Sequence, residues 1–142
     1  MSAATEMGQG SMTSLPLIIA EELDADWSLV TASHGNADPA YVDPIFGMHS
    51  TGGSGSVKNS FMQYRELGAR ARAMLIAAAA KHWGVTPNFV STQSGKLINA
   101  DGKELTYGAM AEAAMHETVP EKIKLKDAKD FRIIGKKTSR LD

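Results

Sequence analysis

The chain is organised around a loop of glycines and small hydroxyl residues that leads directly into its longest helical pattern. The loop reads Thr51-Gly52-Gly53-Ser54-Gly55-Ser56-Val57-Lys58-Asn59-Ser60, and the helical pattern runs from Ser60 to Trp83. Backbone N–H groups in the first turn of a helix have no partner inside the helix, and the helix dipole is positive at this end. The junction therefore favours an anion, above all a phosphate.

The pattern after the loop predicts one long helix that carries the core of a single domain. Its apolar stripe consists of Phe61, Tyr64, Leu67, Ala71, Met74, Leu75 and Ala78. Gly84 and Pro87 mark the end of the helix, because glycine adopts the left-handed C-cap conformation and proline cannot continue a helix. Gly68 and Ala71 are small enough to let a second backbone approach closely.

A second helix is predicted from Ser11 to Leu23, where apolar residues recur at helical spacing. We expect Ser14 to be its N-cap, which would place Pro16 in the tolerated first turn. The acidic residues at its end are predicted to form a polar face; they are Glu21, Glu22 and Asp24.

Shorter patterns complete an α+β prediction for one domain, with a small mixed sheet packed against one long helix and one or two shorter helices. The predicted strands are Trp27–His34, Phe89–Gln93, Lys96–Asn99 and Glu104–Leu105, and a short helix follows from Tyr107 to His116, capped by Thr106. Residues 35–57 are predicted to be an ordered loop. Residues 1–5 are predicted to be a flexible start. After Val119 we expect an extended chain, which is a solvated tail, an edge strand, a strap across neighbouring structure or a basic docking patch.

Composition excludes several classes of protein. The 142 residues include 15 basic and 16 acidic residues, so the net charge of −1 argues against a nucleic-acid-binding surface. The chain contains no cysteine, which excludes disulfides and thiolate-bound clusters within it. No apolar run approaches the ~20 residues of a membrane span. The scattered histidines lack zinc-site spacing, so no metal ligand is predicted, and both a cytoplasmic and a periplasmic location stay open.

Familiar phosphate and nucleophile motifs do not match the loop. A Walker A loop ends in Gly-Lys-Ser or Gly-Lys-Thr, whereas Lys58 is preceded by valine and followed by asparagine. A dinucleotide fingerprint beginning at Gly53 would require a third glycine where Lys58 stands. A nucleophile elbow around Ser54 would require glycine in place of Ser56. The residues alone leave open a phosphate cradle, a site for another phosphorylated ligand, and a linker in a non-catalytic interaction module.

Several motifs taken in order resemble the molybdenum hydroxylases, that is, the large subunits of the xanthine oxidase and aldehyde oxidase family. The motifs are Glu6-Met7-Gly8-Gln9-Gly10, Ala20-Glu21-Glu22-Leu23-Asp24, Thr51 to Val57, Gly68 to Leu75, and Leu125 to Asp142. Within this family the chain most resembles the isoquinoline 1-oxidoreductase beta subunit.

The resemblance implies an oxidoreductase that carries a molybdenum ion on molybdopterin, in many bacterial members as molybdopterin cytosine dinucleotide. It implies oxidation of an N-heterocycle or an aldehyde with a water-derived oxygen, and electron transfer to a small subunit that holds 2Fe-2S clusters. By matching positions, the pterin would be lined by Gly8, Gln9 and Gly10, with Gln9 as a hydrogen-bond partner. The cofactor phosphates would be cradled by Gly52, Gly53, Ser54, Gly55 and Ser56.

The chain also departs from the family. Large subunits are several times longer, and their catalytic glutamate, in a glycine-rich motif near the far C-terminus, has no counterpart here. We therefore expect residues 6–142 to be part of a cofactor-binding domain whose partner is the rest of the large subunit. Alone, this fragment is expected to be inactive and to hold no cofactor.

Overall fold

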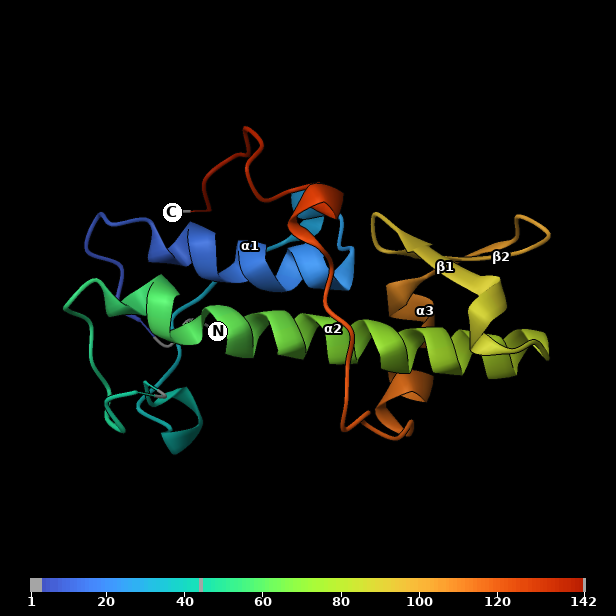
Figure 1. The fold of residues 1–142 in the computed structure, drawn as a ribbon, viewed down its shortest axis with the longest axis horizontal. Helices are drawn as coiled ribbons and strands as arrows, with labels where there is room; N and C mark the ends of the chain where they lie inside the picture. The colour runs from blue at the N-terminus through green and yellow to red at the C-terminus, as the bar shows by residue number, and fades with distance from the viewer. Residues whose placement is uncertain (1–3, 44, 142) are drawn as a thin grey trace.

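The computed structural model describes residues 4–43 and 45–141, and its long helix α2 forms the axis of the molecule. In chain order the elements are α1 (Ser11–Leu23), the 3-10 turns Trp27–Leu29 and Pro39–Tyr41, α2 (Gly55–Trp83), the 3-10 turn Pro87–Phe89, β1 (Val90–Gln93), β2 (Lys96–Asn99), β3 (Glu104–Thr106), α3 (Tyr107–Met115) and the 3-10 turn Ala128–Asp130. Helix α1 lies beside the first half of α2, whereas the sheet and α3 lie against its second half (Figure 1). The predicted α+β class is confirmed.

Helix α2 begins at Gly55, earlier than the Ser60 start that the sequence predicts. Glycine and serine are poor helix formers, which is why sequence reasoning left residues 55–59 in the loop. Packing overrides this preference, since Gly55 is buried and a Cβ built there would lie 3.5 Å from the Phe46 ring. The predicted end is confirmed, because Gly84 is the C-cap with φ of 66°.

The two long helices run in the same direction and touch closely. A Cβ built on Gly68 would lie 2.5 Å from the carbonyl oxygen of Ile19, so only glycine allows the observed approach. Tyr64 packs one turn earlier against Leu15 and Ile18. This confirms the close contact predicted at Gly68, and it places both helix N-termini at the same end of the molecule (Figure 1).

Two details predicted for α1 are wrong. The N-cap is Gly10 with φ of 83°, and the Ser14 hydroxyl instead donates to the Gly10 carbonyl oxygen at 2.9 Å. Pro16 therefore lies inside the helix, beyond its first turn. The helix can begin early because the Glu6 carboxylate accepts hydrogen bonds from backbone N–H groups at its start.

The predicted polar face of α1 is also wrong, since Glu21 and Glu22 are 0% exposed. Both carboxylates bind the C-terminal segment after Val119, which crosses α2 as a strap and then runs beside α1 (Figure 1). A strap was one of the predicted alternatives for this segment. Its end is attached as well, because the Leu141 N–H donates to the Thr13 hydroxyl oxygen at 3.0 Å.

The predicted strand Trp27–His34 does not form. The Asp26 carboxylate accepts from the Ser28 N–H at 3.0 Å and caps a 3-10 turn at Trp27–Leu29. This local side-chain bond competes with the extended backbone that Leu29 and Val30 favour.

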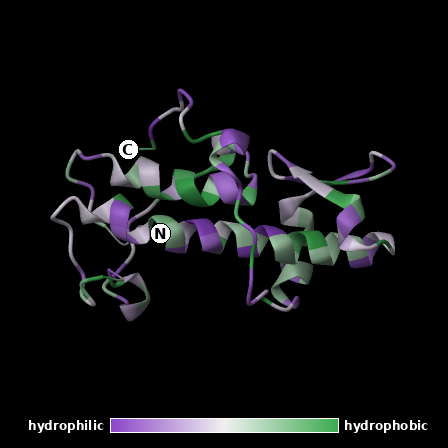
Figure 2. Ribbon diagram, in the orientation of Figure 1, coloured by the Kyte–Doolittle hydropathy of each residue, from purple (hydrophilic) through white to green (hydrophobic). Residues whose placement is uncertain are grey.

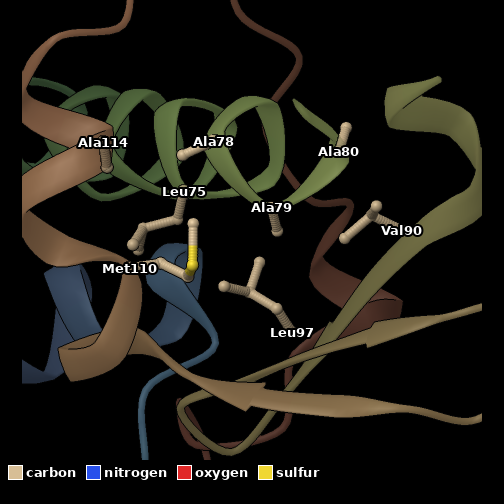
Figure 3. Close-up of a cluster of buried hydrophobic side chains, with 8 residues drawn as sticks. All are labelled: Leu75, Ala78, Ala79, Ala80, Val90, Leu97, Met110 and Ala114. Carbon is tan, nitrogen blue, oxygen red and sulfur yellow. The ribbon is translucent and has the colours of Figure 1, made fainter. Parts of the chain in front are cut away.

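The sheet is antiparallel throughout, not mixed, and has the order β1-β2-β3. Ser94 and Gly95 form the first turn with φ of 45° and 74°, a geometry suited to a tight hairpin. Leu97 is fully buried in the core that Figure 3 shows between β2, α2 and α3. The Thr106 hydroxyl accepts from the Ala109 N–H at 3.2 Å, which confirms the predicted cap of α3.

Hydrophobic residues concentrate in α1 and in the half of α2 that faces the sheet, whereas the first half of α2 is mostly polar (Figure 2). Among the described residues, no helix combines the length and the apolar character needed to cross a membrane.

Candidate functional site

The two glycine loops predicted from the sequence lie next to each other. Each leads into one of the two parallel helices, and both sit at the same end of the molecule (Figure 1). A hydrogen bond joins the segments beside them, since the Thr5 N–H donates to the Thr51 hydroxyl oxygen at 2.9 Å. The structure thus brings together Gly8, Gln9 and Gly10 with the loop that contains Gly52, Gly53, Ser54, Gly55 and Ser56.

The loop before α1 is organised by the carboxylate of Glu6. One carboxylate oxygen accepts from the N–H groups of Gly8 at 2.7 Å and Gly10 at 2.9 Å. The other accepts from the Met12 N–H at 2.9 Å and the Ser11 hydroxyl at 3.2 Å. Hydrogen bonds from the N–H groups of Met12 and Gly10 lower the pKa of Glu6 from 4.5 to about 2. An ionised carboxylate therefore occupies the start of α1.

The Gln9 side chain is exposed but already hydrogen-bonded within its own loop. Its amide oxygen accepts from the Met7 N–H at 2.6 Å, and its amide nitrogen donates to the Thr5 carbonyl oxygen at 2.7 Å. The flanking glycines have φ of 98° at Gly8 and 83° at Gly10, and nothing lies within 4 Å of a Cβ built on either. The space directly in front of both glycines is therefore open.

The loop before α2 contains no acidic residue in the corresponding place. Gly53 and Ser54 both have positive φ, 58° and 54°, and the Gly55 N–H donates to the Gly52 carbonyl oxygen at 2.9 Å. The Ser54 side chain makes no capping bond, and the first turn of α2 contains no acid. Gly52, Gly53 and Ser54 are exposed, so backbone and hydroxyl donors face outward. This donor set fits a phosphate.

Asp43 holds the segment that supports this second loop. It is only 8% exposed and accepts from the N–H groups of Ile45 at 2.8 Å and Phe46 at 2.9 Å. It also accepts from the Asn59 side chain at 3.1 Å, which joins the segment to the first turns of α2. The N–H of Phe46 helps to lower the pKa of Asp43 below its ordinary value.

Sequence reasoning missed Glu6 and Asp43 as site-forming residues. A signal existed for both, since each is an acidic residue that accepts from the N–H two residues further along the chain, at Gly8 and Ile45. This spacing is typical of side chains that stabilise turns.

A cavity of about 460 Å³ lies beside the two loops, and its lining combines polar residues with apolar ones such as Ala4, Met7 and Ala37. Its polar lining comes from Thr5, His34, Asn36, His49, Ser50 and Thr51. Hydroxyl, amide and imidazole groups can each exchange hydrogen bonds with a polar ligand.

A buried ionic cluster fixes the opposite end of α1. The Lys126 ammonium bonds the Glu21 carboxylate at 2.9 Å, and the Arg65 side chain bonds Glu22 at 2.8 Å. Burial alone raises the pKa of Glu21, but bonds from Lys126 and from the Ile134 N–H lower it below its ordinary value. In the described part of the chain, no group of three or more histidine, aspartate or glutamate side chains is placed to hold a metal ion. The cluster joins α1 to α2 through Arg65 and to the C-terminal segment through Lys126, so it acts as a structural clamp.

Comparison of the sequence with known proteins places the chain in a family. Residues 1–140 match the molybdopterin cofactor-binding domain. The membrane-bound aldehyde dehydrogenase (pyrroloquinoline-quinone) of Gluconacetobacter polyoxogenes is 35% identical over 135 residues, which cover 92% of this chain and 17% of that protein. The beta subunit of isoquinoline 1-oxidoreductase from Brevundimonas diminuta is 36% identical over 121 residues, which cover 83% of this chain and 15% of that protein.

A third relative is a nicotinate dehydrogenase subunit from Pseudomonas putida, 29% identical over 138 residues that cover 96% of this chain and 11% of the relative. The chain thus spans less than a fifth of the length of each of these relatives. Two of them are named as subunits of larger enzymes. The resemblance seen in the sequence is confirmed, and the chain belongs to the molybdopterin cofactor-binding domain family.

Proposed function

We propose that residues 6–142 form part of the cofactor-binding region of a large subunit in a molybdenum-containing oxidoreductase. The cofactor is molybdopterin cytosine dinucleotide, and the substrate is an N-heterocycle of the isoquinoline type or an aldehyde, oxidised with a water-derived oxygen. The names of the relatives support these substrate classes. The observation that carries the proposal is the adjacency of two glycine loops at the N-termini of two parallel helices, joined by the bond between Thr5 and Thr51.

The loop before α2 holds the phosphates of the cofactor. Gly52 and Gly53 leave the backbone accessible, because no Cβ separates it from a ligand. Ser54 is exposed and Ser56 is half-buried, so their hydroxyls can donate together with the first-turn N–H groups of α2. The positive end of the helix dipole adds a favourable field for the phosphate charge.

The loop before α1 meets the pterin. The open space in front of Gly8 and Gly10 lets the ring system lie against the backbone. Gln9 carries both a donor and an acceptor on one exposed amide, which suits the alternating donors and acceptors of a pterin. To bind it, Gln9 exchanges its present bonds to Met7 and Thr5 for bonds to the ring.

The bound molybdenum centre supplies the two-electron oxidation of the substrate. The residues described here bind and orient the cofactor, and none of them is proposed as a catalytic group. The catalytic glutamate and the substrate funnel belong to the rest of the large subunit. Electrons leave through a small subunit with 2Fe-2S clusters.

The test is the double substitution Ser54→Ala/Ser56→Ala in the intact protein, with bound molybdenum and the affinity for cytidine diphosphate as readouts. We expect the affinity to fall about thirtyfold, and bound molybdenum to fall with it, because two donors to the phosphate are lost at about 1 kcal/mol each. Ser91→Ala, which removes an exposed hydroxyl on β1, is the matched control and leaves both unchanged. Failure of the unmutated protein to bind cytidine diphosphate, or equal binding by the double variant, favours an interaction module in which the loop is only a linker.

A further inference from the structure

Glu6 uses both of its carboxylate oxygens on the start of α1. One oxygen bonds the N–H groups of Gly8 and Gly10, and the other bonds the Ser11 hydroxyl and the Met12 N–H. Four donors therefore converge on a single side chain. Charge-assisted bonds of this kind are roughly twice as strong as neutral ones.

These bonds fix the geometry of the loop on both sides of Gln9. Gly8 and Gly10 hold left-handed conformations, and each has its N–H directed at the same carboxylate oxygen. Gln9 lies between them, and its amide nitrogen donates to the Ser11 hydroxyl oxygen at 3.0 Å, while Ser11 itself bonds Glu6. The orientation of the Gln9 side chain is thus coupled to the Glu6 carboxylate.

The same bonds decide where an anion can bind. The N–H groups of Gly10 and Met12 at the N-terminus of α1 already have a negatively charged acceptor inside the protein. A phosphate in that place would have to displace Glu6 or approach it as a like charge, which is unfavourable. Neither helix contains an acid in its first turn, and at the start of α2 the Gly55 N–H donates to the Gly52 carbonyl oxygen and not to a carboxylate. The two loops therefore differ in the ligand chemistry that they accept.

We propose that Glu6 is the positioning residue of the cofactor site. Its carboxylate holds Gly8-Gln9-Gly10 in the shape that meets the uncharged ring system, and it excludes phosphate from α1. The anionic end of the cofactor is thereby directed to the loop before α2. This assignment rests on the proposed function for the identity of the ligand, but the exclusion of phosphate by Glu6 can be tested without the cofactor.

The first experiment titrates inorganic phosphate into the intact protein, with backbone amide chemical shifts as the readout. In the unmutated protein we expect shifts at Gly53 to Ser56 and none at Gly8 to Met12. In Glu6→Ala we expect new shifts at Gly8 to Met12, because their N–H groups are released. Glu112→Gln, which neutralises an exposed carboxylate on α3, is the matched control and behaves like the unmutated protein.

The alternative is that Glu6 is only a placeholder that phosphate displaces. In that case the unmutated protein shows phosphate-dependent shifts at Gly8 to Met12, and the inference is overturned. Absence of new shifts in Glu6→Ala also overturns it. A third outcome separates the two proposals. If phosphate changes the amide shifts of neither loop in the unmutated protein but changes those of Gly8 to Met12 in Glu6→Ala, the proposed phosphate loop fails while the role of Glu6 stands.

The second experiment measures cofactor affinity in the same variants. We expect Glu6→Ala to bind molybdopterin cytosine dinucleotide about tenfold more weakly, a loss typical of residues that orient a ligand-binding group. Glu6→Gln retains one acceptor oxygen and is expected to recover part of the loss. The affinity of the loop before α2 for cytidine diphosphate, followed by the amide shifts of Gly53 to Ser56, stays unchanged in both, whereas a merely structural defect would weaken both ligands together. Cofactor binding by Glu6→Ala at the unmutated affinity would overturn the positioning role.

Discussion

The N-termini of α1 and α2 are alike in backbone but differ in what accepts their first N–H groups. Both helices start from a left-handed N-cap without a side-chain capping bond, Gly10 in one and Ser54 in the other. At α1 the Glu6 carboxylate accepts from the N–H groups of Gly10 and Met12. At α2, whose first turn likewise contains no acid, the Gly55 N–H donates to the Gly52 carbonyl oxygen. Glycines leave the N–H groups at a helix start accessible to a ligand. A nearby carboxylate decides whether these N–H groups already have an acceptor inside the protein.

A single ligand can contact both loops only if the two helices keep their present alignment. Gly68 permits their close contact in the middle, and the ionic cluster of Glu21, Glu22 and Lys126 fixes the far end of α1. If α1 moved along α2, the two loops would separate and no single ligand would span them. We therefore expect the largest changes in stability from substitutions in the helix contact and the ionic cluster, and a smaller change from the charge at the loops.

The largest effect is expected from Lys126→Met. Its ammonium bonds the buried Glu21 and Asp24, and its removal leaves carboxylates without their cation. Breaking a buried ion pair in this way costs about 3 to 5 kcal/mol of unfolding free energy. Chemical denaturation measures the loss, and Lys129→Met on the same strap is the control. The Lys129 side chain is 78% exposed and its pair with Asp127 spans 4.0 Å, so we expect no measurable change. Equal stability of the two variants would refute the clamp.

A smaller loss of stability is expected from Gly68→Ala. The added Cβ would lie 2.5 Å from the Ile19 carbonyl oxygen, so the helices must move apart. Overpacking of this kind costs about 1 to 3 kcal/mol. In the control Gly108→Ala on α3, the nearest atom to the new Cβ lies 4.0 Å away. Stability of the control is retained or rises by up to about 1 kcal/mol. Thermal unfolding of the two variants gives the comparison, and a Gly68→Ala protein as stable as Gly108→Ala would contradict the close approach.

The smallest effect is the contribution of the α1 loop to the pH dependence of stability. The pKa of Glu6 is lowered from 4.5 to about 2 in the folded protein, so its ionised form stabilises the fold above pH 4.5. That contribution is lost as the pH falls from 4.5 to about 2. Glu6→Gln should therefore show a shallower loss of stability across this window than the unmutated protein, measured by denaturation at each pH. The control Glu112→Gln should keep the unmutated slope, and a Glu6→Gln curve parallel to it would show that Glu6 contributes nothing.

Local patterns in the sequence predicted most of the elements. The helical stripe after Ser60, the hairpin around Ser94-Gly95 and the Thr106 cap each depend on neighbours within a few residues, so the sequence contains their cause. The adjacency of the two glycine loops could be inferred from the family resemblance, and the close helix contact from Gly68.

Long-range partners account for what sequence reasoning missed. Glu21 and Glu22 look like a solvated helix face because their partner Lys126 lies more than 100 residues further along the chain. The strand predicted at Trp27–His34 failed for a local reason. The Ser28 N–H donates to the Asp26 carboxylate, and this short-range bond overrides a weak strand preference. The role of Glu6 was missed because its carboxylate acts on backbone N–H groups, and an acid two residues before such a group is common to many turns.

The central claim is that the loop before α2 takes the phosphate and the loop before α1 does not. A crystal structure of the intact protein with molybdopterin cytosine dinucleotide tests it most directly. We predict phosphate oxygens within hydrogen-bond distance of the backbone between Gly53 and Ser56, with Glu6 still bonded to Gly8, Gly10 and Met12. A phosphate at the start of α1 with Glu6 displaced, or a cofactor that touches neither loop, would contradict the account.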